Sequence, residues 1–136
     1  MLVKEIMHSV TKVSSDTSIS EAAGIMDQKS IGSVLIEGSN RIMGIMTERD
    51  ILRKIVAKGR NPDEVKVKDI MNKPIITIDV DEDILEASRT MDQNRIRRLI
   101  VTENGQIVGK ITANSIARNL KYLMAKNTTE YTRVEY

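Results

Sequence analysis

The chain of 136 residues carries 21 lysines and arginines against 19 aspartates and glutamates, and hydrophobic residues make up 40% of it. This composition is ordinary for a soluble globular protein, and a net charge of +2 is too small to indicate a polyanionic partner by itself. The absence of cysteine excludes disulfides, thiolate metal sites and cysteine nucleophiles, and no apolar run approaches the ~20 residues that span a bilayer.

The N-terminal residues lack the charged-then-apolar pattern of a secretion signal, so we expect a cytoplasmic protein. His8 is the single histidine. We expect it to be a loop or helix-end residue, because a histidine metal site would need ligands from a partner chain. The sequence therefore predicts no metal site.

In chain order, the first half predicts a helical turn over 3–7, a strand over 11–13, a helix from Ile19, strands over 34–36 and 42–46, and a closing helix over 51–56. The long helix is amphipathic, since Ile19, Ala22 and Met26 recur at helical spacing. Ser18 precedes it in the position of an N-cap. The closing helix ends before Gly59, and residues 60–66 form a linker.

The second half repeats the first, because residues 9–55 align with residues 74–120 at a constant offset of 65. Thirteen of these 47 positions are identical, and Val3–Met7 recurs as Val67–Met71. The repeated elements are a turn over 67–71, a strand over 75–78, a helix from Ile84 with Asp83 as its cap, strands over 99–101 and 107–111 joined through Asn104-Gly105, and a closing helix from Ile116.

Each half is a β-α-β-β-α unit, which at about 60 residues is marginal as an independent domain. Its helices can cover only one face of a three-stranded sheet, while the apolar runs over 34–36 and 99–101 are typical of strands buried on both faces. The sequence therefore predicts an α+β fold in which the two sheets pack on each other about a pseudo-twofold axis.

The segment from Gly44 to Asp50 stands where a strand meets a helix, and it holds the residues best suited to a ligand. Gly44 allows another backbone or a ligand to approach the strand closely. Thr47 occupies the N-cap position, beside free N–H groups that suit a phosphate, and the Asp50 carboxylate can accept bonds from two adjacent ribose hydroxyls. In the alternative interpretation, Thr47 and Asp50 form only a capping box.

This segment resembles the pattern of CBS motifs, which is glycine, a hydrophobic residue, any residue, serine or threonine, two further residues and aspartate, and which binds adenosine nucleotides. The duplication, the element order and the segment Val3–Met7 also resemble that family, and the resemblance covers residues 3 to about 125. It implies a Bateman module, with a first CBS motif over residues 1–60, a second over 61–125 and a tail over 126–136.

The resemblance further implies a free-standing regulatory module without catalytic activity, which acts through a partner protein and forms a homodimer. It implies AMP, ADP or ATP as the ligand, with S-adenosylmethionine and NAD as alternatives. A nucleic-acid-binding CBS protein is the alternative function. Against that alternative, the chain has no Phe or Trp and only three Tyr, so few aromatic platforms exist for stacking bases.

Carried over to this sequence, the family pattern assigns the ribose and phosphate to Gly44, Thr47, Arg49 and Asp50, with the phosphates also within reach of Arg95, Arg97 and Arg98. It assigns the adenine to Ile45, Pro74, Ile75 and Ile96. The alternative for Arg95–Arg98 is a solvated strand edge.

The second repeat departs from the pattern, because Ser115 stands where the first repeat has Asp50. A hydroxyl cannot hold both ribose hydroxyls as a carboxylate does. The matching site, with Thr112 and Ser115 and a base pocket at Val10 and Ile31, is therefore expected to be weak or empty.

Overall fold

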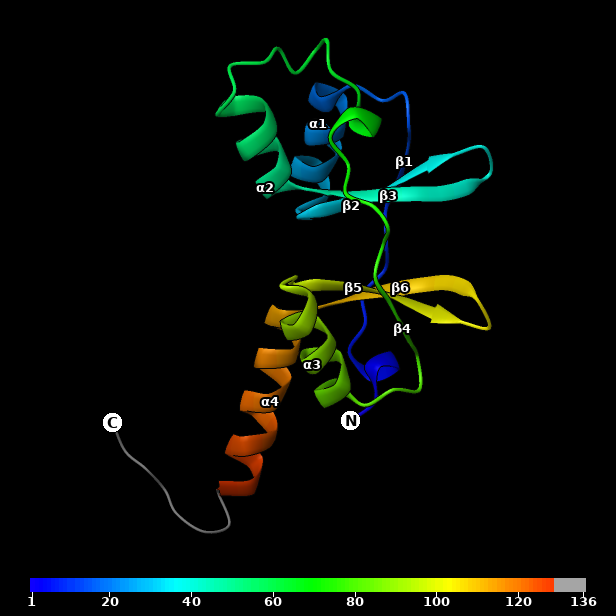
Figure 1. Cartoon of the computed structure of the whole chain (residues 1–136). Coiled ribbons are helices and arrows are strands. Elements are labelled where there is room, and N and C mark those ends of the chain that lie inside the picture. The colour runs from blue at the N-terminus through cyan, green and yellow to red at the C-terminus, as the bar shows by residue number, and fades with distance from the viewer. Residues whose placement is uncertain (129–136) are drawn as a thin grey trace, which may run out of the picture. The chain divides into compact units, whose positions relative to one another are not determined.

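The computed structural model describes residues 1–128, and the chain divides into two compact units of the same architecture. The N-repeat unit comprises Val10–Ile75, and the C-repeat unit comprises Met1–Ser9 together with the chain from Ile76 onward. The short helix that opens each sequence repeat thus belongs to the unit formed by the other repeat. Figure 1 shows the N-terminal turn, in blue, beside the strands of the C-repeat unit.

The N-repeat unit consists of β1 (Lys12–Ser14), α1 (Ile19–Lys29), β2 (Ser33–Gly38), β3 (Arg41–Thr47), α2 (Glu48–Ile51), the π-helix η2 (Leu52–Val56) and the 3-10 helix η3 (Val67–Asp69). Its sheet has the order β1-β2-β3, with β1 parallel to β2 and β3 antiparallel to β2. This confirms the predicted element order. The closing helix differs from expectation, because it changes from α-helix to π-helix after one turn.

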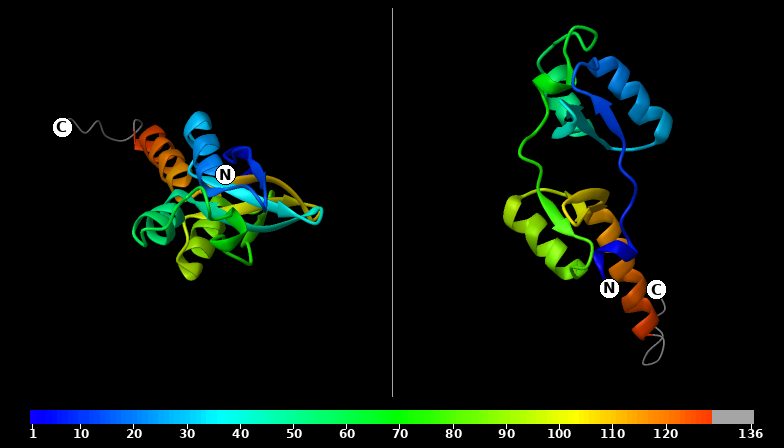
Figure 2. Two further views of the ribbon diagram at one scale, coloured as in Figure 1. Left: turned by 90° about the horizontal axis from the view of Figure 1, so that it is seen from above. Right: turned by 90° about the vertical axis from the view of Figure 1, so that its right-hand side faces the viewer.

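The C-repeat unit consists of the 3-10 helix η1 (Val3–Glu5), β4 (Thr77–Asp79), α3 (Ile84–Asn94), β5 (Arg98–Glu103), β6 (Gln106–Thr112) and α4 (Ala113–Thr128). Its sheet repeats the same order and pairing, and α3 and α4 lie on one face of it (Figures 1 and 2). Here the closing helix is regular and extends into the segment that we expected to be a tail. The remainder of that tail, 129–136, lies outside the described residues.

Local sequence explains where these elements begin and turn. The Ser18 hydroxyl accepts the N–H of Glu21 at 3.1 Å, and an Asp83 carboxylate oxygen accepts the N–H of Leu85 at 2.8 Å, so both predicted N-caps are confirmed. Asn104 and Gly105 have φ values of 51° and 77°, the left-handed pair that a tight hairpin between β5 and β6 requires.

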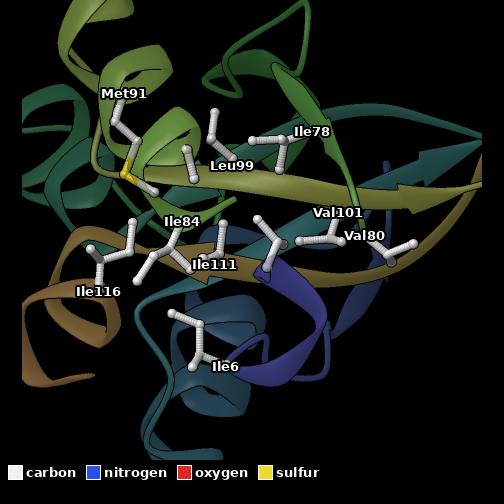
Figure 3. Close-up of a cluster of buried hydrophobic side chains, with 11 residues drawn as sticks. Ile6, Ile78, Val80, Ile84, Met91, Leu99, Val101, Ile111 and Ile116 are labelled. Atoms are coloured by element: carbon white, nitrogen blue, oxygen red, sulfur yellow. The ribbon is translucent and has the colours of Figure 1, made fainter. Parts of the chain in front are cut away.

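Each unit buries its own hydrophobic core between the helices and one face of its sheet. In the C-repeat unit, Met91 from α3, Leu99 from β5 and Ile111 from β6 converge with Ile6 from the N-terminal segment (Figure 3). The N-repeat core is formed by Val13, Ile19, Ala22, Met26, Val34, Ile36, Met46, Ile55, Val65, Val67 and Ile70.

The central strands are buried on both faces, as predicted. Val34 and Ile36 belong to the N-repeat core, and strand alternation places Leu35 on the opposite face, where it is only 2% exposed. The packing of the two sheets on each other stays a prediction. Along residues 1–128, no helix combines the length and the apolar character needed to cross a membrane.

Candidate ligand-binding site

The junction of β3 and α2 is a capping box. Thr47 has an extended backbone and its hydroxyl accepts the N–H of Asp50 at 3.3 Å, while a carboxylate oxygen of Asp50 accepts the N–H of Thr47 at 2.8 Å. The sequence allowed two interpretations of Thr47 and Asp50, a helix cap and a ribose site. The structure confirms the cap. The same pair also places a carboxylate that is only 8% exposed at the start of the helix.

Both carboxylate oxygens of Asp50 have partners beyond the cap. Oδ2 accepts the Thr47 hydroxyl at 3.0 Å and the Asn72 amide at 2.7 Å, and Oδ1 lies 3.3 Å from the Lys54 ammonium. Lys54 in turn donates to the carbonyl of Ile70 at 2.7 Å and to the side-chain oxygen of Asn72 at 3.2 Å. A ribose that used both oxygens would therefore replace Asn72 and Lys54 as partners of Asp50.

Gly44 lets the segment at Met71 and Asn72 pass close to β3. Ile45 and Asn72 form an antiparallel bridge with N–H to O distances of 3.0 and 2.8 Å. A Cβ on Gly44 would lie 2.6 Å from the carbonyl oxygen of Asn72. The close approach expected at Gly44 is thus made by the backbone of Asn72. The chain continues from Asn72 to Pro74 and Ile75, two of the residues assigned to the adenine.

The C-repeat junction keeps this geometry with a hydroxyl in place of the carboxylate. Ser115 is 5% exposed and accepts the N–H of Thr112 at 3.1 Å, and Thr112 accepts the N–H of Ser115 at 3.1 Å. His8 occupies the position of Asn72, because it forms the matching bridge with Lys110, and its carbonyl lies 2.8 Å from a Cβ placed on Gly109. His8 is therefore a loop residue, as expected, and it also pairs with Lys110 through its backbone.

The predicted site residues fall on different units. Gly44, Ile45, Thr47, Arg49, Asp50, Pro74 and Ile75 lie in the N-repeat unit, as do Val10 and Ile31, whereas Arg95, Ile96, Arg97, Arg98, Thr112 and Ser115 lie in the C-repeat unit. Arg95 ends α3 in a left-handed conformation, and Ile96 packs against the C-repeat core. The assignment of these residues to adenine and phosphate stays a prediction.

Of the three arginines at the start of β5, only Arg98 belongs to the strand. Arg98 pairs with Thr112 and is half-buried, whereas Arg97, one residue before the strand, is exposed. Burial, together with the positive charge of Arg98, lowers the pKa of Lys110. Arg98 and Lys110 thus make the half-buried face of this sheet cationic. Lys110 stands at the position that Ile45 holds in β3.

Lys54 and Asn72 were not among the predicted site residues. Lys54 had a usable signal, since it stands four residues after Asp50, which is the spacing of an ion pair on a helix. Asn72 had none in the local pattern, because its contact with Asp50 depends on the path of the linker past β3.

Three comparisons relate the chain to known proteins. The family model that matches is the CBS domain, over residues 3–57 and 67–122. An uncharacterised protein of Methanopyrus kandleri is 41% identical over 118 residues, which cover 85% of this chain and 60% of that protein. The CBS domain-containing protein YhcV of Bacillus subtilis is 30% identical over 118 residues, which cover 86% of this chain and 84% of that protein. A solved structure of a hexameric CBS-CP12 protein from bloom-forming cyanobacteria has a TM-score of 0.83 at 25% identity, and the match covers 98% of this chain and 76% of that one.

Proposed function

Because the chain belongs to the CBS-domain family, we propose that it is a regulatory module that binds AMP, ADP or ATP at the junction of β3 and α2. The observation that carries the proposal is the Asp50 carboxylate, which is 8% exposed and held at a helix start, while the matching junction of the second repeat has only Ser115. A carboxylate in this position can accept both hydroxyls of a ribose.

Ligand binding in this proposal is an exchange of hydrogen bonds. The two ribose hydroxyls take the places of the Asn72 amide and the Lys54 ammonium on Asp50, so that no buried acceptor loses its partner. Thr47 keeps its bonds to Asp50, which preserves the cap. Ile45, Pro74 and Ile75 supply apolar surface for the adenine on the same unit.

The proposed module regulates a partner protein and catalyses no reaction. The chain has no cysteine, and its one histidine lies in the C-repeat unit with its backbone paired to Lys110. The carboxylate at the proposed site already interacts with an ammonium group and an amide, and the hydroxyls of a ribose are donors that can take the same places.

We expect at least one adenosine nucleotide to stabilise the fold. A ligand at a hundredfold above its Kd adds about 2.7 kcal/mol to the free energy of unfolding. For a chain of this size that raises Tm by several degrees, at about 3–5 °C per kcal/mol. Thermal shift with AMP, ADP, ATP, S-adenosylmethionine and NAD at millimolar concentration measures it. Five unchanged melting curves would contradict nucleotide binding.

We also expect a homodimer that uses the closing helix of the first repeat. Leu52 and Val56 lie four residues apart on this helix and are 59% and 66% exposed, which leaves an apolar stripe in contact with water. Light scattering of the wild type at tens of micromolar should give twice the chain mass of 15.3 kDa. A double substitution of Leu52 and Val56 by serine should give the monomer mass, and a monomeric wild type would contradict the dimer.

A further inference from the structure

A second feature of the N-repeat unit is a pocket of about 300 Å³ beside Lys54, which is lined by Lys54, Lys58, Arg60, Asp69, Ile70 and Met71. None of these residues was expected at a ligand site. The volume is at the lower end of the ~300–1,000 Å³ typical of small-molecule pockets. The lining holds three cationic side chains and one carboxylate, so its chemistry favours an anion.

The cations of this pocket are poorly compensated. Within the part of the chain that the structure describes, neither Lys58 nor Arg60 forms an ion pair, and both are exposed. The carboxylate of Asp69 accepts the backbone N–H of Lys66 at 3.3 Å. Positive charge therefore remains available to a ligand.

Lys54 joins this pocket to the proposed ribose site. Its ammonium lies 3.3 Å from Asp50 and donates at 2.7 Å to Ile70, which is itself part of the pocket lining. When a ribose takes Asp50, Lys54 loses its carboxylate partner and keeps its place at the pocket wall. A second anion can then replace the carboxylate.

The repeat provides an internal comparison. Continuing the offset of 65, the second repeat has Asn119, Leu123 and Ala125 where the first has Lys54, Lys58 and Arg60. Lys54 lies within the aligned residues 9–55, so the change from Lys54 to Asn119 accompanies the change from Asp50 to Ser115.

We propose that the pocket of Lys54, Lys58 and Arg60 binds the phosphate groups of a ligand. An arginine fork pairs with two phosphate oxygens, and lysine ammonium groups add point charges. Resting on the proposed function, the inference makes the ligand a nucleotide whose ribose lies on Asp50 and whose phosphates enter this pocket, so that ATP binds more tightly than AMP and AMP more tightly than adenosine. The same chemistry would also accept free pyrophosphate.

The test compares the full-length wild type with a K58A/R60A variant by titration calorimetry with adenosine, AMP, ATP and pyrophosphate. The matched control is R118A/K121A, which removes the same charge from exposed positions of α4. We expect K58A/R60A to weaken ATP binding by about tenfold or more, since charge-assisted contacts to phosphate are lost. Adenosine affinity should change by less than about twofold, and the control should behave as wild type.

Five outcomes would overturn or redirect the inference. Unchanged ATP affinity in K58A/R60A overturns it, and a lower Tm with unchanged affinities shows that these cations only stabilise the helix end. An equal loss for adenosine and ATP also overturns it, because the phosphate would then not be what is recognised. Pyrophosphate binding that the variant loses, with no binding of adenosine or nucleotides, supports the pocket and contradicts the proposed function. Adenosine binding without a preference for ATP supports the proposed function and contradicts the phosphate pocket.

Discussion

Replacing Asp50 by serine should weaken nucleotide binding by roughly ten- to a thousandfold. A hydrogen bond to a charged group contributes about 1.5–3 kcal/mol, against about 0.5–1.5 for a neutral one, and one or two such bonds to the ribose are lost. Serine is the informative substitution because Ser115 already caps the matching helix with its hydroxyl. Asp50→Ser should therefore keep the start of α2, and titration calorimetry measures the affinity.

The reciprocal substitution is the control for this result. Ser115→Asp supplies the second junction with a carboxylate in the same Gly-x-x-Thr frame, and it should create or strengthen a second binding site. The stoichiometry per chain reports this directly. Two equal sites in the wild type, or undiminished affinity in Asp50→Ser, would show that Asp50 acts only as a cap.

The fold could be predicted from the sequence because its determinants are local and occur twice. Ser18 and Asp83 mark matching helix starts, and Asn104-Gly105 marks a hairpin that the structure contains. The spacing of Ile19, Ala22 and Met26 fixed the buried face of α1, and all three belong to the core. Where a residue type demands a conformation, the pattern was sufficient.

Two features of the fold had no local signal. Ile51 and Ile55 in the first repeat match Ile116 and Leu120 in the second, so this shared spacing of apolar residues does not separate a π-helix from a regular helix. The sequence also does not show that the opening helix of each repeat packs in the unit of the other repeat. The strands at Gly44 and Gly109 are equivalent, so either could in principle pair with the segment at residue 72 or with the segment at residue 8. Which strand each segment joins is decided by the path of the whole chain.

The site was predicted in part for the same reason. Thr47 and Asp50 are three residues apart, so their pairing follows from helix geometry and is confirmed as a cap. The amide of Asn72 reaches Asp50 only through the fold. The sequence therefore identified the Asp50 carboxylate and missed the Asn72 amide that donates a hydrogen bond to it.

Replacing Gly44 by alanine should destabilise the protein by about 1–3 kcal/mol, as overpacking of a tight contact does. The new Cβ would lie 2.6 Å from the carbonyl oxygen of Asn72 and 2.9 Å from the sulfur of Met71. The sulfur can move, but the carbonyl is held by the bridge between Ile45 and Asn72. The linker must therefore shift away from β3, which also weakens the contact of Asn72 with Asp50.

The same chemical change at Gly24 is the matched control. Gly24 lies in the middle of α1, and a Cβ placed there meets no atom within 4 Å. Alanine is favoured over glycine inside a helix by about 0.8–1 kcal/mol, so Gly24→Ala should stabilise the protein. Urea unfolding of both variants then gives changes of opposite sign. A Gly44→Ala protein as stable as Gly24→Ala would mean that the linker yields without cost, and that the bridge at Asn72 does not hold the segment against β3.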